Sequence, residues 1–269
     1  MLFNDTLTPA LAISQPAHAW LSGQLMQAWA ETLSPAVLLA AEQHDIGWLD
    51  WETAPSFDPA TGRPHLFRHV GPAKHAPMWA RGVERALGAW GSQVALLVSR
   101  HGSVIYTRFT DRSALAAADA AGAAHYIATQ KVLQDGWAGA LGLDAAALAY
   151  QTGFVALSDT MSLALCGELR TPLTLEVPVL GGGTRGIRLD RDAAGVFLLD
   201  PWPFAAAALT LELEARPLPE AGRFADEASM REWHRGPARA VLRVRLAPGT
   251  GSGVAAPKRG FPGAAAAVS

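Results

Sequence analysis

Gln43-His44-Asp45-Ile46-Gly47-Trp48, residues 43–48, is the stretch of sequence on which the predicted fold depends. It follows a segment, Pro35 to Ala41, whose apolar residues recur at helical spacing. Ser34 before Pro35 is a typical helix start, with Ser34 as the N-cap and Pro35 in the first turn. The stretch therefore predicts a helix that ends on an adjacent histidine and aspartate, two side chains that bind divalent transition metals.

Further histidines and a distant aspartate stand in apolar or helical surroundings. His18 falls in a segment of helical periodicity, and His101 ends an apolar run. Asp159 lies within an apolar helical segment, and His75 follows a loop rich in Trp, Phe and His. A polar side chain in an apolar setting costs folding free energy unless it is paired or binds a metal. We therefore expect one metal site, with the ligands His18, His44, Asp45, His75, His101 and Asp159.

Some of these assignments have alternatives in the sequence. His75 has two possible substitutes, His65 and His69. Asp159 competes with three other aspartates, Asp111, Asp119 and Asp135, but it alone lies in a strongly apolar helix. The alternative to a metal site is a set of core histidines bonded to backbone carbonyls, with Asp159 capping a helix.

The kinds of ligand indicate which cofactor the site would hold. Imidazole and carboxylate groups suit Fe, Mn, Zn or Ni, and an aspartate next to a histidine can bridge two ions. The single cysteine, Cys166, lies in an apolar run where we expect a buried, reduced thiol, so a four-cysteine zinc site is excluded. We expect a divalent transition metal, with two ions in the site.

The order of these ligands resembles that of a known superfamily. His18, then His44-Asp45, then Asp159 follow the defining pattern of the HD superfamily of metal-dependent phosphohydrolases. Its two-metal branches, which include cyclic-dinucleotide phosphodiesterases and diiron oxygenases, carry two further histidines before the last aspartate, where His75 and His101 stand here. The resemblance implies a dinuclear metal site in a hydrolase or an oxygenase.

Three phrases look closer still to an uncharacterised bacterial family with the HD fold: residues 15–19, 43–48 and 157–163. That similarity spans most of residues 1–250, and it implies a fold rather than a reaction. The chain lacks the Gly-Tyr-Pro signature of the cyclic-dinucleotide phosphodiesterases, and Trp48 follows Gly47 where those enzymes have a lysine. Cyclic-dinucleotide cleavage is therefore not expected.

The pattern of elements changes once along the chain. Residues 1–170 carry mostly helical signals, and residues 171–248 consist of short alternating runs such as Leu209 to Leu213, which predict antiparallel strands. Residues 249–269 are rich in Gly, Ala, Ser and Pro and predict a disordered tail. We therefore expect a mainly α fold, an HD-domain, phosphodiesterase-like helical bundle with a small antiparallel β-sheet appended at its C-terminal side.

Several side chains near the expected ligands could take part in catalysis or bind a substrate. Glu42, close to His44, is a candidate acid or base beside Asp45. Trp48 could line a substrate pocket, although core packing explains a single tryptophan equally well. Three cationic side chains could hold a phosphate or carboxylate group, or simply lie on a solvated face: Lys74, Arg100 and Arg108.

Composition and charge restrict the class of partner. The net charge is −2, so no basic field favours a nucleic acid, and a small molecule is the expected partner. The first residues lack the positive region of a signal peptide, and no run of about 18 apolar residues occurs, so we expect a soluble, cytoplasmic protein that does not enter a membrane. The sequence leaves the oligomeric state open.

These observations lead to three functional hypotheses. The first is a metal-dependent hydrolase that acts on a small-molecule phosphate ester through a metal-activated water. The second is a diiron oxygenase with the same ligands and a small polar substrate. The third is a non-catalytic metal-binding or sensor domain.

Overall fold

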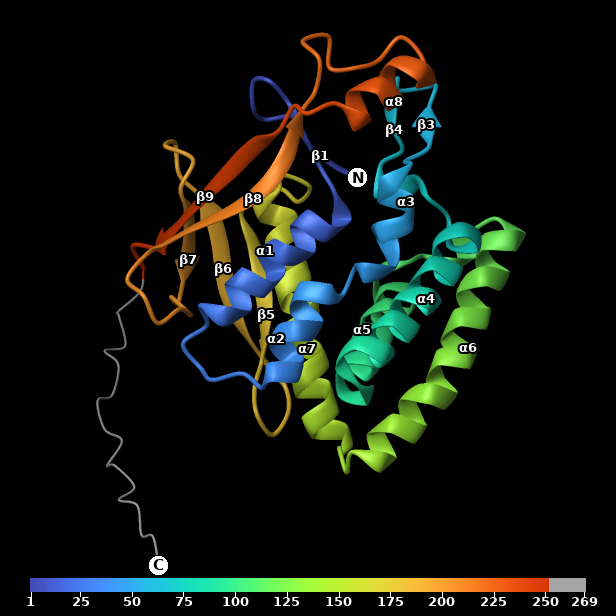
Figure 1. Cartoon of the computed structure of the whole chain (residues 1–269). Coiled ribbons are helices and arrows are strands. Elements are labelled where there is room, and N and C mark those ends of the chain that lie inside the picture. The colour runs from blue at the N-terminus through green and yellow to red at the C-terminus, as the bar shows by residue number, and fades with distance from the viewer. Residues whose placement is uncertain (252–269) are drawn as a thin grey trace, which may run out of the picture.

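A curled, mixed β-sheet forms one side of the protein. The computed structural model describes residues 1–251, and its large sheet has seven strands in the order β1-β2-β8-β9-β7-β6-β5 (Figure 1). The strands are β1 (Leu2–Asn4), β2 (Leu11–Ile13), β5 (Leu173–Pro178), β6 (Thr184–Arg191), β7 (Phe197–Asp200), β8 (Leu209–Pro217) and β9 (Ala240–Pro248). Neighbouring strands are antiparallel except β7 and β9, which are parallel.

This sheet corrects the predicted fold class. The prediction of a mainly α, HD-like bundle with a small appended antiparallel sheet is wrong, because the sheet is large, mixed and built from both ends of the chain. β2 pairs with β8 through Leu11 opposite Pro217 and Ala12 opposite Arg216. The first residues of the chain thus belong to the same sheet as residues 173–248.

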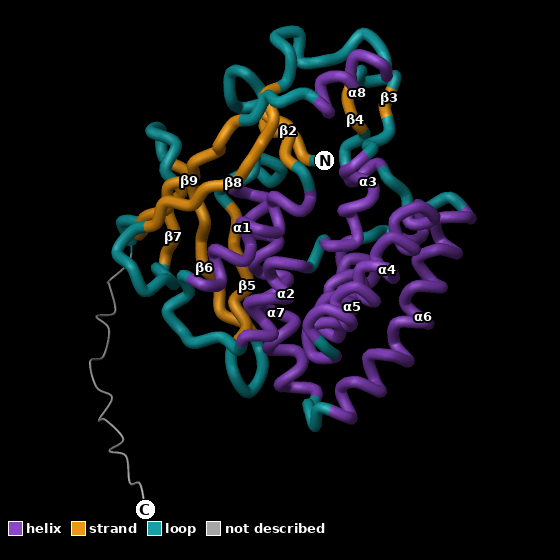
Figure 2. The backbone as a smooth tube through the Cα atoms, in the orientation of Figure 1, coloured by secondary structure: helices purple, strands orange, loops and turns teal. Residues whose placement is uncertain are grey.

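Two layers of helices lie beside the sheet. The inner layer contains α1 (Gln15–Gln27) and α7 (Ala145–Leu165), which contact the sheet, and α2 (Pro35–Gln43), which packs on both of them. The outer layer contains α4 (Pro72–Trp90), α5 (Ser92–Val104) and α6 (Ala117–Ala140). Figure 2 shows this separation, with most strands on one side of the molecule and the long helices on the other.

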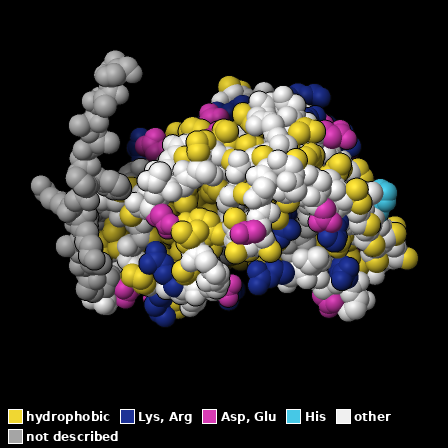
Figure 3. Space-filling view, turned by 90° about the horizontal axis from the view of Figure 1, so that it is seen from below, with side chains coloured by type: hydrophobic (Ala, Val, Ile, Leu, Met, Phe, Trp, Pro, Cys, Tyr) yellow, Lys and Arg dark blue, Asp and Glu magenta, His cyan; other side chains and the backbone are white. Residues whose placement is uncertain are grey.

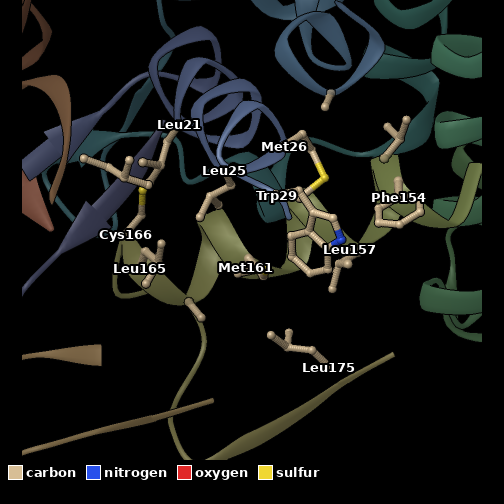
Figure 4. Packing of buried hydrophobic residues seen from close by; sticks show 14 of the residues in the cluster. Leu21, Leu25, Met26, Trp29, Phe154, Leu157, Met161, Leu165, Cys166 and Leu175 are labelled. Atoms are coloured by element: carbon tan, nitrogen blue, oxygen red, sulfur yellow. The ribbon is translucent and has the colours of Figure 1, made fainter. Parts of the chain in front are cut away.

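The main hydrophobic core lies between the sheet and the inner helices. The strands that cover it alternate buried and exposed residues, as in β8, because one face of the sheet packs and the other meets solvent. Figure 4 shows Leu21 and Leu25 of α1 facing Met161 of α7, with Leu175 of β5 below them. Cys166 belongs to this core and is a free, buried thiol, as expected.

The loop-rich segment between α2 and α4 is ordered and consists of several short helices and strands. It contains the 3-10 helix η1 (Ile46–Trp48), α3 (Leu49–Thr53), the small hairpin of β3 (Phe57–Asp58) and β4 (Arg63–Pro64), and the 3-10 turn η2 (Phe67–His69). After α5 follow a π-turn, η3 (Ile105–Phe109), and the 3-10 turn η4 (Arg112–Ala114). α8 (Glu227–Arg235) lies near the hairpin and α3 (Figure 1).

The surface carries charges of both signs. Seen from below, hydrophobic side chains lie among Lys, Arg, Asp and Glu side chains (Figure 3). Within residues 1–251, no single helix is long and apolar enough to cross a membrane; α6 and α7 meet that test only as a pair, which is bent by 119°. The expected disordered tail, 249–269, lies outside the described residues from residue 252 onward.

Candidate metal centre

Four helices bring the central side chains of the site together. His18 lies near the start of α1, which begins at the N-cap Ser14, whose side chain accepts a hydrogen bond from the Ala17 N–H. His44 is the C-cap residue of α2, and Asp45 follows it at the start of η1. The site is completed by two residues on the helices packed against α1 and α2, Asp159 on α7 and His101 on α5. The centre thus lies between the inner and outer helical layers.

Four ligand atoms of this centre lie close together. The Nε2 atoms of His18 and His44 are 3.1 Å apart. Asp45 Oδ2 lies 3.2 Å from the first of these nitrogens and 3.6 Å from the second, and Asp159 Oδ1 lies 3.4 and 3.5 Å from them. Two atoms that are each about 2.1 Å from one ion, at tetrahedral or octahedral angles, are separated by roughly 3.0 to 3.5 Å. The spacing of His18, His44 and Asp159 therefore suits ligands of a single metal ion, and Asp45 forms a second such group with His44 and His101.

Hydrogen bonds on the far side of each ring fix the histidine tautomers. His44 Nδ1 lies 2.8 Å from the Ala41 carbonyl, which can only accept, so Nδ1 carries the proton. His18 Nδ1 lies 2.6 Å from Ser162 Oγ, whose own proton is donated to the Asp159 carbonyl at 2.9 Å. With both Nδ1 atoms protonated, each Nε2 directs a lone pair into the site, as metal-bound histidines do.

The electrostatics of the centre favour a cation. Burial alone lowers the pKa of His44, but the carboxylates of Asp45 and Asp159 outweigh it and raise that pKa to about 9. Burial would raise the pKa of both carboxyl groups, yet the facing His44 holds them below their usual range. Two carboxylates that stay ionised inside the protein require a positive charge beside them, which a metal ion or a bound proton supplies.

His101 is a fifth candidate ligand. One of its ring nitrogens lies within 4.8 Å of ligand atoms of His44 and Asp45, and the rings of His101 and His44 meet edge-on at 4.6 Å between centroids. Burial and the neighbouring His44 lower the pKa of His101 to about 4, so its ring is neutral and able to bind a metal. Its buried Nδ1 has no hydrogen-bond partner in the described part of the chain.

The structure places His75 outside these groups. Its Nδ1 lies 2.7 Å from Tyr106 Oη, and the two rings stack with centroids 5.4 Å apart. Trp79 packs against the same ring at 4.9 Å. Neither group of potential ligand atoms found within residues 1–251 includes His75. Its substitutes lie elsewhere too: His65 is bonded to the Ser56 carbonyl, and His69 lines a surface pocket.

The three competing aspartates have structural partners instead. Asp111 accepts hydrogen bonds from Ser113, and Asp119 accepts one from the Ala73 N–H at the start of α4. Asp135 pairs with Lys131 one turn away on the exposed side of α6. Of the aspartates considered from the sequence for this position, only Asp159 joins the histidines in the described residues.

The predicted catalytic and substrate-binding residues are only partly brought to the centre. Asp45 is in it, whereas the Glu42 side chain packs against Gly23 on α1 and accepts a hydrogen bond from Gln43. Trp48 is buried against Trp51. The three cationic candidates lie apart, with Arg100 bonded to Thr152 Oγ1 and the other two exposed, Lys74 and Arg108.

Two serines in the second layer were not predicted. Ser162 holds His18, and Ser22 donates to Ser162 Oγ at 2.9 Å, which links α1 to α7. Both are fully buried. Their signal in the sequence is a serine on an otherwise apolar helix, one turn after a predicted ligand: Ser22 after His18 and Ser162 after Asp159.

Comparison with known proteins gives one match. The sequence model of a family described as "Protein of unknown function (DUF3891)" matches residues 1–220. No curated protein and no solved structure matches the chain. The matched range contains His18, His44, Asp45, His101 and Asp159.

Proposed function

The chain belongs to the DUF3891 family, and we propose that it is a metal-dependent hydrolase with a divalent transition-metal ion, Fe, Mn, Zn or Ni, at the centre formed by α1, α2, α5 and α7. One observation carries this proposal: the Nε2 atoms of His18 and His44 face each other at 3.1 Å with two carboxylate oxygens beside them. A divalent ion bound there would lower the pKa of a coordinated water and neutralise charge on a substrate oxygen.

The arrangement is poorly explained by core histidines alone. In that interpretation each ring would satisfy both nitrogens with protein groups, and the Nδ1 atoms do so. The Nε2 atoms instead face each other at 3.1 Å, where two lone pairs repel unless a cation lies between them, either a metal ion or the proton that the raised pKa places on His44. A metal ion would accept both lone pairs and the Asp159 carboxylate together, which one proton cannot do.

The ligands favour one tightly held ion over two. His44 has one nitrogen available, since its Nδ1 is bonded to Ala41, and so it can bind a single ion. His75, which a second ion would require in the expected six-ligand site, lies outside both groups of potential ligand atoms found within residues 1–251. The side chain of Asp45 remains able to bridge, so a second ion would depend on Asp45 and His101.

A phosphate ester is the substrate class that we propose. The order of the ligands along the chain, a histidine, an adjacent His-Asp pair and a distant aspartate, is similar to that of metal-dependent phosphohydrolases. In the proposed reaction, Asp45 is the side chain best placed to orient the attacking water, because its Oδ2 lies at the centre and its lowered pKa keeps it ionised as a hydrogen-bond acceptor.

One observation favours a non-catalytic metal site as the second candidate. The side chains of His18, His44, Asp45 and Asp159 are only 0 to 11% exposed. Structural metal sites are closed in this way, whereas catalytic sites keep a position for water or substrate. Cobalt(II) substitution separates the two, because its absorption spectrum reports the coordination number and shifts when azide occupies an open position.

Metal content and activity test the proposal together. We expect purified protein to contain close to one equivalent of a transition metal by elemental analysis, and His44→Ala and Asp45→Ala to lose it. His125→Ala, on the exposed side of α6, is the matched control and should keep the metal. Hydrolysis of a phosphate-ester panel by Mn- or Zn-loaded protein without oxygen supports the hydrolase.

Three results would overturn this assignment. Unchanged metal content in His44→Ala would show that the ligands are misassigned. Two iron ions with oxygen consumption would indicate an oxygenase. A metal-bound protein that cleaves no ester, and whose cobalt absorption spectrum does not change when azide is added, would indicate the non-catalytic site.

A further inference from the structure

A second polar pocket lies away from the metal centre, where the start of α1 meets α3, β8 and α8. It encloses about 380 Å³, which is the size range of small-molecule sites. α8 is held over the end of β8 by the Trp233 indole N–H, which donates to the Pro217 carbonyl at 2.8 Å. The polar side chains that line the pocket are Ser14, Glu52, Thr53, Glu214, Arg216, His234 and Arg239.

Two arginines in this pocket have no acidic partner. Arg216 donates to the Gly236 carbonyl at 3.4 Å and lies over the Trp233 ring. Arg239 donates to the carbonyls of Gly236 and Ala238 at 3.0 and 2.9 Å. Within residues 1–251, neither guanidinium forms an ion pair, whereas Arg188, Arg231 and Arg243 on the same part of the chain each pair with a carboxylate.

The cationic groups in the pocket repel one another, which lowers the pKa of two of them. Partial burial and the charge of Arg239 lower the pKa of Arg216. His234 is affected in the same way, because burial and then the charge of Arg216 lower its pKa. The charges of Glu214 and Glu52 offset part of this repulsion at Arg216 without an ion pair in the described part of the chain, and an anion bound directly to the guanidinium groups would offset more of it.

Within residues 1–251, Glu52 forms no ion pair with either arginine, although its charge raises the pKa of Arg216. Its Oε1 accepts the Gln15 N–H at 2.9 Å and pairs with the amino group of Met1 at 3.3 Å. The Glu52 side chain is buried, and this burial raises the pKa of its carboxyl group. The carboxylate is therefore tied to the start of α1, and both guanidinium groups keep free N–H donors.

We propose that this pocket binds the oxyanion of a small molecule, a carboxylate or a phosphate, between Arg216 and Arg239. Guanidinium groups bind such oxygens through paired, charge-assisted hydrogen bonds. The volume admits one small ligand and excludes a folded partner. Binding of the anion in this pocket does not depend on whether the metal centre is catalytic.

Titration calorimetry of the full chain with inorganic phosphate and with acetate tests this inference. At constant ionic strength, set with potassium chloride, we expect saturable binding of at least one of the two anions. Arg216→Gln and Arg239→Gln should each weaken it about tenfold or more, which corresponds to 1.4 kcal/mol. Arg245→Gln, an exposed arginine of β9 outside the pocket, is the matched control and should bind as the parent does.

The identity of the bound anion follows from the same titrations. Binding of phosphate alone identifies a phosphorylated ligand, and binding of acetate alone a carboxylate ligand. His44→Ala should bind with the parent's affinity, which separates this pocket from the metal centre. Absence of saturable binding up to about 10 mM, or equal affinity in Arg216→Gln, Arg239→Gln and the parent, would overturn the inference. Circular dichroism of each variant verifies that it is folded.

Discussion

His18 and His44 point their Nε2 atoms at each other across 3.1 Å, while their Nδ1 atoms are held by Ser162 and Ala41. The residues lie on consecutive helices, α1 and α2, and their rings meet nearly at right angles. Hydrogen bonds behind the rings thus aim two lone pairs at one point. The geometry of the centre is therefore set by its second layer as much as by the ligands themselves.

Replacing Ser162 with alanine should weaken metal binding without removing a ligand. The His18 ring would lose the oxygen that accepts its Nδ1 proton, so its tautomer and orientation would no longer be fixed. We expect a roughly 10- to 100-fold loss of zinc affinity, measured by competition with a chromophoric chelator. Ser158→Ala is the control, because within the described residues its hydroxyl bonds only to the Val155 carbonyl. Equal losses in both variants would contradict a specific role for Ser162.

Metal binding should strengthen as the pH rises. The pKa of His44 in the metal-free protein is raised to about 9, so a proton occupies the site that a metal would take. The zinc affinity should therefore increase from pH 6.5 to about 9 and then level off. Calorimetry in buffers of different ionisation enthalpy would reveal the released proton. A pH-independent affinity would contradict proton competition at His44.

The stability of the metal-free protein should follow the opposite trend. A histidine whose folded-state pKa is raised stabilises the fold fully below its ordinary pKa of 6.5, and this contribution is lost as the pH rises through about 9. Melting temperatures of chelator-treated protein should thus fall across that range. Added zinc at about 100 times its Kd should raise the free energy of unfolding by about 2.7 kcal/mol. In His44→Ala we expect neither the fall in melting temperature with pH nor the stabilisation by zinc. A melting temperature that rises with pH in chelator would rule out this linkage.

Helices and strands with clear periodicity were predictable from the sequence. Ser34 is confirmed as the N-cap of α2, and the alternating run from Leu209 is confirmed as the start of β8. β1 and β2 were missed because each has three residues, too few to show alternation, and because β2 pairs with β8 far along the chain. Alternation also says nothing about direction, so the parallel pairing of β7 and β9 was not foreseen.

In the candidate site, too, features of the local sequence could be predicted, whereas contacts between distant residues could not. Apolar surroundings marked His18, His101 and Asp159, because a buried polar side chain needs a partner wherever it lies. His75 was grouped with them by order alone. Its position depends on Tyr106 in the π-turn after α5, a contact between helices that spacing along the chain does not reveal.

Gly82 lets α4 lie directly against η1, the turn that follows the metal ligands. A Cβ atom on Gly82 would lie 2.7 Å from the Gly47 nitrogen and 2.8 Å from its Cα, so the backbone would have to move. We expect Gly82→Ala to lower the free energy of unfolding by about 1 to 3 kcal/mol in urea titrations.

Gly88→Ala is the matched control for this substitution on the same helix. Nothing lies within 4 Å of the Cβ it would carry, so the gain in helix propensity should leave stability equal or up to about 1 kcal/mol higher. Because Gly47 stands close after Asp45, Gly82→Ala should also reduce zinc affinity, whereas Gly88→Ala should not. If both variants were equally stable, close packing of α4 on η1 would not be what holds Asp45 in place.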